Sequence, residues 1–186
     1  MKKMKMISIL VISLLVTVFF TSCGEERVYI EGIENFNIAT STTSLNRFLL
    51  PSDDFLEKFE CEKANYYYND YSKTSFIMDS IEQSIIICEY SEEYYSDAKE
   101  YCINNMTLSE EIVFEHNGYS FAQRTDSTSV RDFPRHFTMF VYNDSNHTLI
   151  FMGFYATSDH HSEIQLAQDD WGAFLDKYYG DYYDFD

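Results

Sequence analysis

The sequence predicts an α+β domain, in which an antiparallel sheet of about six to seven strands has two main helices packed on one face. Three observations support this fold class. Short runs of β-branched and aromatic residues are separated by turn residues, tight turns join neighbouring runs, and two longer segments carry apolar residues at helical spacing. Hydrophobic residues make up 45% of the chain and aromatic residues 18%, so the domain can bury a sizeable core.

Seven short runs of β-prone residues are expected to form the sheet: 64–70, 73–78, 84–90, 112–115, 119–124, 135–142 and 148–157. Asn117-Gly118 predicts a hairpin turn, because both central residues of such a turn need positive φ. The segment 149–155 is apolar at successive positions, so we expect a central strand that needs cover on each face.

Three segments have the spacing of helices. A short helix is expected after Ser52, and a longer one from 91 to about 106, with Tyr95, Ala98, Cys102 and Met106 on one face. A closing helix is expected over about 162–179, ended by Gly180. Its apolar stripe consists of Ile164, Ala167, Trp171, Phe174, Leu175 and Tyr178.

The N-terminus has the pattern of a secretory signal. A basic start with Lys2, Lys3 and Lys5 precedes the apolar run 6–20, which is too short for a comfortable membrane-spanning helix of roughly 20 residues. Thr21-Ser22-Cys23 follows and resembles the lipobox of bacterial lipoproteins. That resemblance implies a signal peptide over 1–22, cleavage before Cys23, and a diacylglyceryl group on the Cys23 sulfur. The alternatives are an ordinary signal peptide or an uncleaved anchor.

The remaining chain is expected to be one domain behind a spacer. Residues 23–44 are polar and irregular, which favours a flexible tether with a short strand near 28–30, and residues 45–186 form a single domain. The lipobox, the acidic composition and the motif Asp169-Asp170-Trp171-Gly172-Ala173-Phe174 resemble small uncharacterised bacterial lipoproteins. This resemblance implies an α+β domain, anchored by lipid on the extracytoplasmic side of the cell membrane, and supplies no activity.

The charge of the chain restricts its partners. The formal net charge is -18, and loss of the three lysines in residues 1–22 takes it to -21. Nucleic acid is therefore excluded as a partner, because phosphate binding depends on clustered Lys and Arg. The expected partners are the membrane, through lipid on Cys23, and a basic protein or peptide, or a glycan.

Two clusters have residue types found in metal sites. His160, His161 and Glu163 have the residue types of a zinc site, but adjacent residues on a helix point about 100° apart, so a solvated helix start is the favoured interpretation. Asn143-Asp144-Ser145-Asn146 has oxygen ligands at close spacing, yet turn chemistry alone explains it. No nucleophile motif or phosphate loop is present, so we expect no enzyme and no cofactor.

Cys61, Cys88 and Cys102 are spaced unlike any metal motif. Two states therefore remain possible: one disulfide with a free thiol, or three buried thiols.

Runs of tyrosine at 66–68, 94–95, 178–179 and 182–183 are typical of binding surfaces, although core packing also uses tyrosine. The main hypothesis is a non-enzymatic binding lipoprotein; an inhibitor or immunity protein against a basic toxin and a metal-assisted hydrolase are alternatives.

Overall fold

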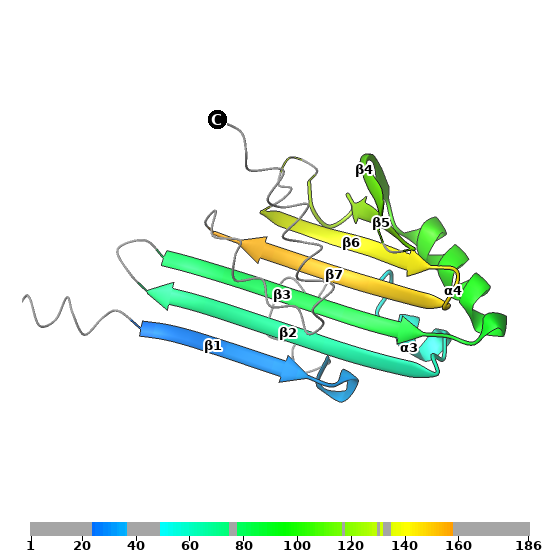
Figure 1. Ribbon diagram of the computed structural model, residues 1–186, viewed down its shortest axis with the longest axis horizontal. Helices are drawn as coiled ribbons and strands as arrows, with labels where there is room; N and C mark the ends of the chain where they lie inside the picture. The colour runs from blue at the N-terminus through cyan, green and yellow to red at the C-terminus, as the bar shows by residue number, and fades with distance from the viewer. Residues whose placement is uncertain are drawn as a thin grey trace, which may run out of the picture.

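A seven-stranded antiparallel sheet forms the centre of the computed structural model (Figure 1). The structure describes residues 24–36, 49–74, 78–116, 118–129, 131 and 135–157. The strand order is β1-β2-β3-β7-β6-β5-β4, and every neighbouring pair is antiparallel. The predicted α+β class and antiparallel sheet are therefore confirmed.

The strands are β1 (Gly24–Glu31), β2 (Lys63–Thr74), β3 (Met78–Glu89), β4 (Leu108–His116), β5 (Tyr119–Arg124), β6 (His136–Asn143) and β7 (Thr148–Ala156). The described helices are the short α3 (Phe55–Lys58), the longer α4 (Glu92–Asn105) and a 3-10 turn, η1 (Ile33–Asn35). The expected strands 64–70 and 73–78 do not exist as separate elements. β2 runs without a break through residues 64–70 and pairs with β3 along its whole length. This continuous backbone pairing outweighs the low strand preference of the polar residues 69–73.

The expectation of a flexible tether over 23–44 is wrong for residues 24–36. β1 begins at Gly24 and pairs with β2 from Gly24 opposite Thr74 to Glu31 opposite Tyr67. The short strand expected near 28–30 is part of β1. An edge strand tolerates charged residues, so its polar composition hides its full length. Residues 24–31 therefore belong to the sheet. Residues 37–48 lie outside the described residues.

One face of the sheet, here called the first face, packs against α3 and α4. Tyr66, Ile86, Phe151 and Phe140 lie side by side across four strands and are fully buried. The α4 residues in the same core are those predicted from their spacing: Tyr95, Ala98, Cys102 and, just after the helix, Met106. Burying a side chain of this size contributes about 1.5–3 kcal/mol, so this face is a main source of stability.

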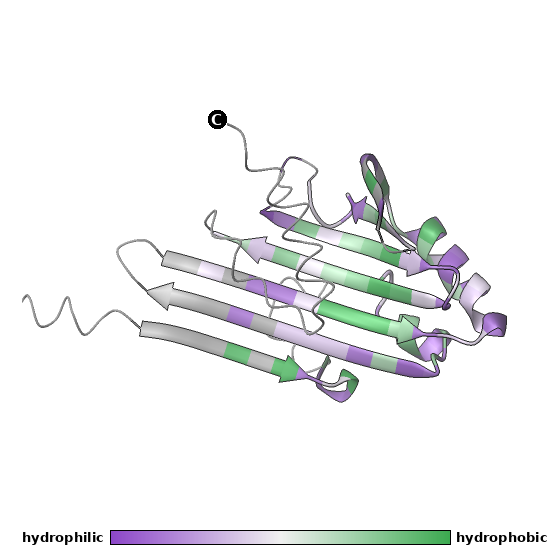
Figure 2. Cartoon of the chain, viewed as in Figure 1, coloured by the Kyte–Doolittle hydropathy of each residue, from purple (hydrophilic) through white to green (hydrophobic). Residues whose placement is uncertain are grey.

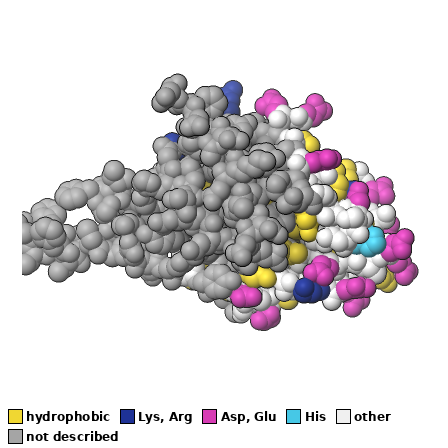
Figure 3. Space-filling view, in the orientation of Figure 1, with side chains coloured by type: hydrophobic (Ala, Val, Ile, Leu, Met, Phe, Trp, Pro, Cys, Tyr) yellow, Lys and Arg dark blue, Asp and Glu magenta, His cyan; other side chains and the backbone are white. Residues whose placement is uncertain are grey.

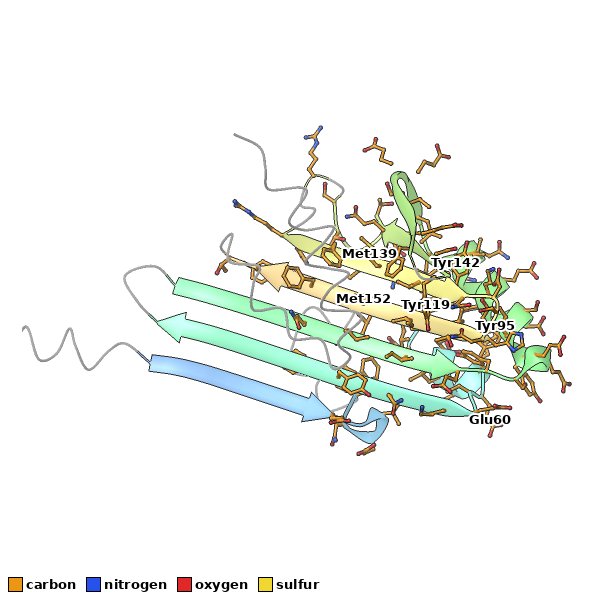
Figure 4. The ribbon with its side chains drawn as sticks, in the orientation of Figure 1. Glu60, Tyr95, Tyr119, Met139, Tyr142 and Met152 are labelled. Atoms are coloured by element: carbon orange, nitrogen blue, oxygen red, sulfur yellow. The ribbon has the colours of Figure 1, made fainter. Side chains whose placement is uncertain are left out.

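The second face is also apolar along β3, β5, β6 and β7. Nine apolar side chains there are at most 8% exposed, and the core cluster that contains α3 and α4 includes none of them. Figure 2 shows the apolar residues along β3, β6 and β7, and Figure 4 places Met139 and Met152 on adjacent strands. The residues concerned are Ile85, Ile87, Phe121, Phe137, Met139, Val141, Ile150, Met152 and Phe154.

β7 is the middle strand of the seven, as its two apolar faces predict. The predicted hairpin at Asn117-Gly118 joins β4 to β5, and Gly118 has the positive φ of 80° that the turn needs. The helix expected over 162–179 lies outside the described residues, so the packing of two helices on one face is not established by the described part of the chain.

Candidate functional site

Exposed carboxylates gather on α4 and on the edge strand β4, which follows α4 after two residues. Figure 3 shows acidic side chains along this margin of the molecule and few basic ones. We call this set the acidic surface. It consists of Glu92, Glu93, Asp97 and Glu100 on α4, with Glu110, Glu111 and Glu115 on β4.

The helical period explains why α4 carries acids outward. Because Tyr95, Ala98 and Cys102 face the core, the acidic residues of the helix lie on its other sides and are exposed to solvent. Glu92 and Glu93 lie in the first turn, where negative charge is favourable beside the helix N-terminus. The last turn contains no basic residue, so the helix adds no compensating charge at its end.

Lys99 is the only basic residue of α4, and it is engaged outside the helix. Its Nζ lies 2.5 Å from Oδ1 of Asp144 and 3.9 Å from the centroid of the Tyr142 ring. The Tyr95 hydroxyl donates a hydrogen bond of 2.6 Å to the same Asp144 oxygen. Figure 4 shows Tyr95 and Tyr142 at one end of the sheet. These contacts join α4 to the β6–β7 turn and neutralise Lys99.

The protonation states of this cluster follow from its geometry. Hydrogen bonds from Lys99 and then Tyr95 lower the pKa of Asp144. Burial, followed by the hydrogen bond to Asp144, raises the pKa of the Tyr95 hydroxyl. At neutral pH the cluster is therefore a carboxylate held by an ammonium and a neutral phenol.

The segment Asn143-Asp144-Ser145-Asn146, whose spacing resembles a calcium loop, forms a turn in the structure. The Asn143 side-chain oxygen accepts hydrogen bonds from the Ser145 backbone at 2.9 Å and the Ser145 hydroxyl at 2.6 Å. Asp144 is held by Lys99, and His147 adopts a left-handed φ of 54° at the start of β7. Within the described residues, no three His, Cys, Asp or Glu side chains are placed to hold a metal ion.

A buried arginine stabilises the neighbouring loop. Arg124 is 4% exposed, and its Nη1 donates a hydrogen bond of 2.6 Å to the Leu49 carbonyl. Its Nε and Nη2 each lie 3.1 Å from one carboxylate oxygen of Asp126. This two-point contact satisfies a charge that would be costly to bury alone. Arg124 could not be predicted from the sequence, because its partner Leu49 is 75 residues away.

An open depression of about 580 Å³ adjoins this loop. Glu111 belongs to both the depression and the acidic surface, and Arg131 is the basic residue of the lining. The other lining residues are Thr125, Asp126, Ser127, Thr128 and Ser129. Hydroxyl and carboxylate groups dominate, so the depression offers hydrogen-bond acceptors to a ligand that carries N–H or O–H donors.

The tyrosine runs divide between core and surface. Tyr66 and Tyr68 are buried in the core and Tyr67 is half-buried, whereas Tyr94 is 48% exposed on α4. The first run therefore gives little support to a tyrosine-rich binding surface. Several predicted residues lie outside the described part of the chain: Cys23, His160, His161, Glu163, Tyr178, Tyr179, Tyr182 and Tyr183.

Comparison with models of protein families found no match, and no similar protein was found among curated sequences or among solved structures. None of the helices in the described ranges combines the length and the hydrophobicity needed to cross a membrane.

We predict that Asp144→Asn makes the stability less dependent on pH. Because the folded-state pKa of Asp144 is lowered, its contacts stabilise the fold above the unfolded pKa and are lost as pH falls through the folded value. The side chain is 66% exposed, so solvent screening limits the effect at pH 7 to about 1 kcal/mol or less. The free energies of unfolding in urea of the variant and of Asp97→Asn, an exposed control on α4, should differ at pH 7 and converge near pH 2. An undiminished difference at low pH would contradict this assignment.

Proposed function

We propose that this chain is a lipid-anchored, non-enzymatic binding protein on the extracytoplasmic side of the cell membrane, and that its acidic surface binds a basic protein or peptide. The observation that carries the proposal is the exposure of seven carboxylates on α4 and β4, while Lys99 is occupied by Asp144. Binding a cationic partner would remove the mutual repulsion of these carboxylates, which is a favourable electrostatic contribution.

The position of β1 supports this arrangement. Gly24 pairs with Thr74, which in turn pairs with Met78, so the start of β1 lies at the same end of the sheet as the β2–β3 connection. α4 begins after Glu89, at the opposite end of β3. A strand of 12 residues spans roughly 40 Å. Lipid on Cys23 would therefore hold one end of the sheet near the membrane and direct α4 away from it.

Electrostatics favours the same orientation. An anionic membrane surface attracts clustered Lys and Arg and repels carboxylates over about a Debye length, roughly 8 Å at physiological salt. A position of α4 far from the anchor keeps its acids outside that range. The acidic surface is then free to meet a partner from the extracytoplasmic space.

An inhibitor or immunity protein against a basic toxin is the second candidate, and the same carboxylates favour it. The two candidates differ in the consequence of binding, since an inhibitor must abolish its partner's activity. The metal-assisted hydrolase depends on His160, His161 and Glu163, which lie outside the described residues, and no contact of the described part of the chain supports it.

We further propose that the expected closing helix covers the second face of the sheet, opposite α4, and not the face that α4 occupies. The second face carries nine buried apolar side chains, which need a cover that excludes water. The apolar stripe predicted for 162–179 has the composition for this role. This placement completes a sheet with helices on both sides.

We predict that Cys23→Ser releases the protein from the membrane. The serine hydroxyl does not replace the thiol that receives the diacylglyceryl group, and two acyl chains supply the stable attachment. Fractionation should find the variant in the soluble fraction, and metabolic labelling with a fatty acid should find no acyl group. A Cys61→Ser variant is the matched control and should stay attached. Unchanged retention of Cys23→Ser would indicate an uncleaved anchor.

We predict that neutralising α4 weakens binding to a cationic probe. The variant Glu93→Gln/Asp97→Asn/Glu100→Gln should lose about tenfold or more in affinity for a lysine-rich peptide, measured by calorimetry at low salt. Its control, Asp53→Asn/Glu57→Gln/Glu60→Gln, changes the net charge equally around α3 and should bind nearly normally. Equal losses in both variants would show that net charge, and not this surface, determines binding.

We predict that Trp171, the single tryptophan of the chain, reports the proposed position of the closing helix. Its fluorescence should be blue-shifted in the folded protein and shielded from iodide. Met152→Lys on the second face should shift the emission to the red, whereas Lys99→Met on the α4 side should leave it unchanged. A solvent-exposed tryptophan in the folded protein would overturn the placement.

A further inference from the structure

The outer edge of β4 has no strand partner in the described part of the chain. β4 is the last strand of the sheet, and β5 is the only described helix or strand with which it makes extensive contact. Figure 1 shows the β4–β5 hairpin at one margin of the molecule. An edge of this kind presents unpaired backbone N–H and C=O groups, onto which an extended peptide segment can add as a further strand.

The hairpin determines which backbone groups of β4 point outward. Two residues separate His116 from Tyr119, which lie opposite each other at the end of the β4–β5 ladder. In a two-residue hairpin the residues that flank the turn form a hydrogen-bonded pair, and the pairs farther along alternate between the non-hydrogen-bonded and hydrogen-bonded types. Glu115 and Val113 precede His116 by one and three positions, so they belong to non-hydrogen-bonded pairs. Their N–H and C=O groups therefore point away from β5, toward the outer edge.

The exposed side chains of this edge combine an apolar residue with carboxylates. Val113 and Glu115 are exposed on the same face of β4, since they are two residues apart, and the exposed Glu111 lies just before them. Val113 is 57% exposed, the largest fraction among the big apolar side chains of the described ranges. The register of β4 shifts between Leu108 and Val113, so the regular edge begins at Val113. None of the ion pairs in the same ranges involves Glu111 or Glu115.

The register also places this edge relative to α4. Val113 is opposite Ala122 of β5, which is opposite Phe140 of β6, and residues opposite each other share a face of the sheet. Phe140 belongs to the core of the first face, together with the buried residues of α4. A strand added to β4 would therefore direct every second side chain toward the side of the sheet that carries the carboxylates of α4.

We propose that the basic partner of the acidic surface binds to β4 as an extended segment, with an apolar side chain against Val113 and a Lys or Arg on each side of it, facing Glu111 and Glu115. The segment runs antiparallel to β4, which continues the order of the neighbouring strands. This inference rests on the proposed function, because it states how the basic partner is held. The occupant has an apolar residue two positions from each of two basic residues.

The spacing of the two carboxylates favours an extended partner over a helical one. Glu111 and Glu115 are four residues apart on a strand, so their backbone positions are separated by roughly 13 Å. Residues four apart in an extended segment have the same separation, whereas on a helix they are only about 6 Å apart. The extended segment also covers the Val113 side chain and pairs with the outward backbone groups. Backbone pairing supplies affinity, and the opposing side chains supply the preference for this pattern.

The test titrates short peptides with blocked termini into the full chain carrying Cys23→Ser, at a salt concentration of about 0.15 M that screens long-range attraction. The peptide TKTVTKT has the proposed pattern, and VTTTKKT has the same composition and charge in another order. We expect TKTVTKT to bind about tenfold more tightly, because only this order places its side chains opposite Glu111, Val113 and Glu115. Titration followed by NMR measures both affinities, and equal affinities would overturn the proposal.

Methylation of the peptide backbone tests strand addition directly. In the antiparallel arrangement the valine N–H of TKTVTKT donates to the β4 edge, whereas the N–H of the next threonine points away from it. Methylation of the valine nitrogen should therefore lower the affinity about tenfold, and methylation of the threonine nitrogen should have little effect. An unchanged affinity after methylation of the valine, or a larger loss after methylation of the threonine, would contradict strand addition.

Variants of the chain locate the surface. Glu111→Gln/Glu115→Gln should lose about tenfold in affinity for TKTVTKT, and Val113→Thr, which keeps the strand preference, should lose about threefold. The control Asp53→Asn/Glu57→Gln removes the same charge around α3 and should bind as the parent does. A loss in this control equal to that of Glu111→Gln/Glu115→Gln would place the peptide elsewhere and refute the assignment to β4.

Amide exchange provides a measurement that does not depend on charge. The N–H groups of Val113 and Glu115 should exchange with deuterium about tenfold or more slowly when the peptide is bound, because they then pair with it. Protection that is present without peptide and grows with protein concentration would mean that a second copy of the chain occupies the edge, which is also contrary to the proposal.

The outcomes separate this inference from the proposed function. If a lysine-rich peptide binds to the acidic surface but TKTVTKT binds no better than VTTTKKT, the proposed function stands and strand addition to β4 is wrong. If none of these peptides binds, the proposed function fails, and strand addition fails with it.

Discussion

The two apolar faces of β7 are the constraint on which the rest of this structure depends. Leu149 and Phe151 point to one side, Ile150 and Met152 to the other, and all four are buried. A strand of this kind is stable only in the middle of a sheet with cover on both sides. This need for cover explains why β3 and β6 flank β7 and repeat its pattern of apolar residues on both faces. It also explains why α4 presents an apolar stripe to the first face.

Features set by local patterns could be predicted from the sequence, whereas features set by pairing could not. The buried side of α4, the central place of β7 and the turn at Gly118 follow from periodicity or backbone preference. Only a short strand near 28–30 could be predicted within β1, because its charged residues become a strand only through the backbone of β2. The contact between Lys99 and Asp144 joins residues 45 apart, and no sequence spacing indicates it. The acidic character was visible in the composition, but its placement on α4 and β4 required the fold.

The cluster at Asp144 and the surrounding carboxylates have complementary roles. Lys99 would otherwise be a counter-charge within α4, yet it is turned to the β6–β7 turn by Asp144 and the ring of Tyr142. The same contact fixes the helix against the sheet, so the outward carboxylates are carried by a rigid element. A surface ordered before binding loses less conformational entropy when a partner arrives, which improves recognition without additional contacts.

β4 has a single neighbour, β5, in the described sheet, and it carries Val113 with 57% of its surface exposed. A free edge with an apolar residue is a template on which a further strand, or another copy of the chain, can add and begin aggregation. Glu111 and Glu115 flank Val113 and repel an identical edge that carries the same charges. The carboxylates of β4 thus also protect the solubility of the protein, and evolution toward a weaker acidic character at this edge would carry the risk of self-assembly.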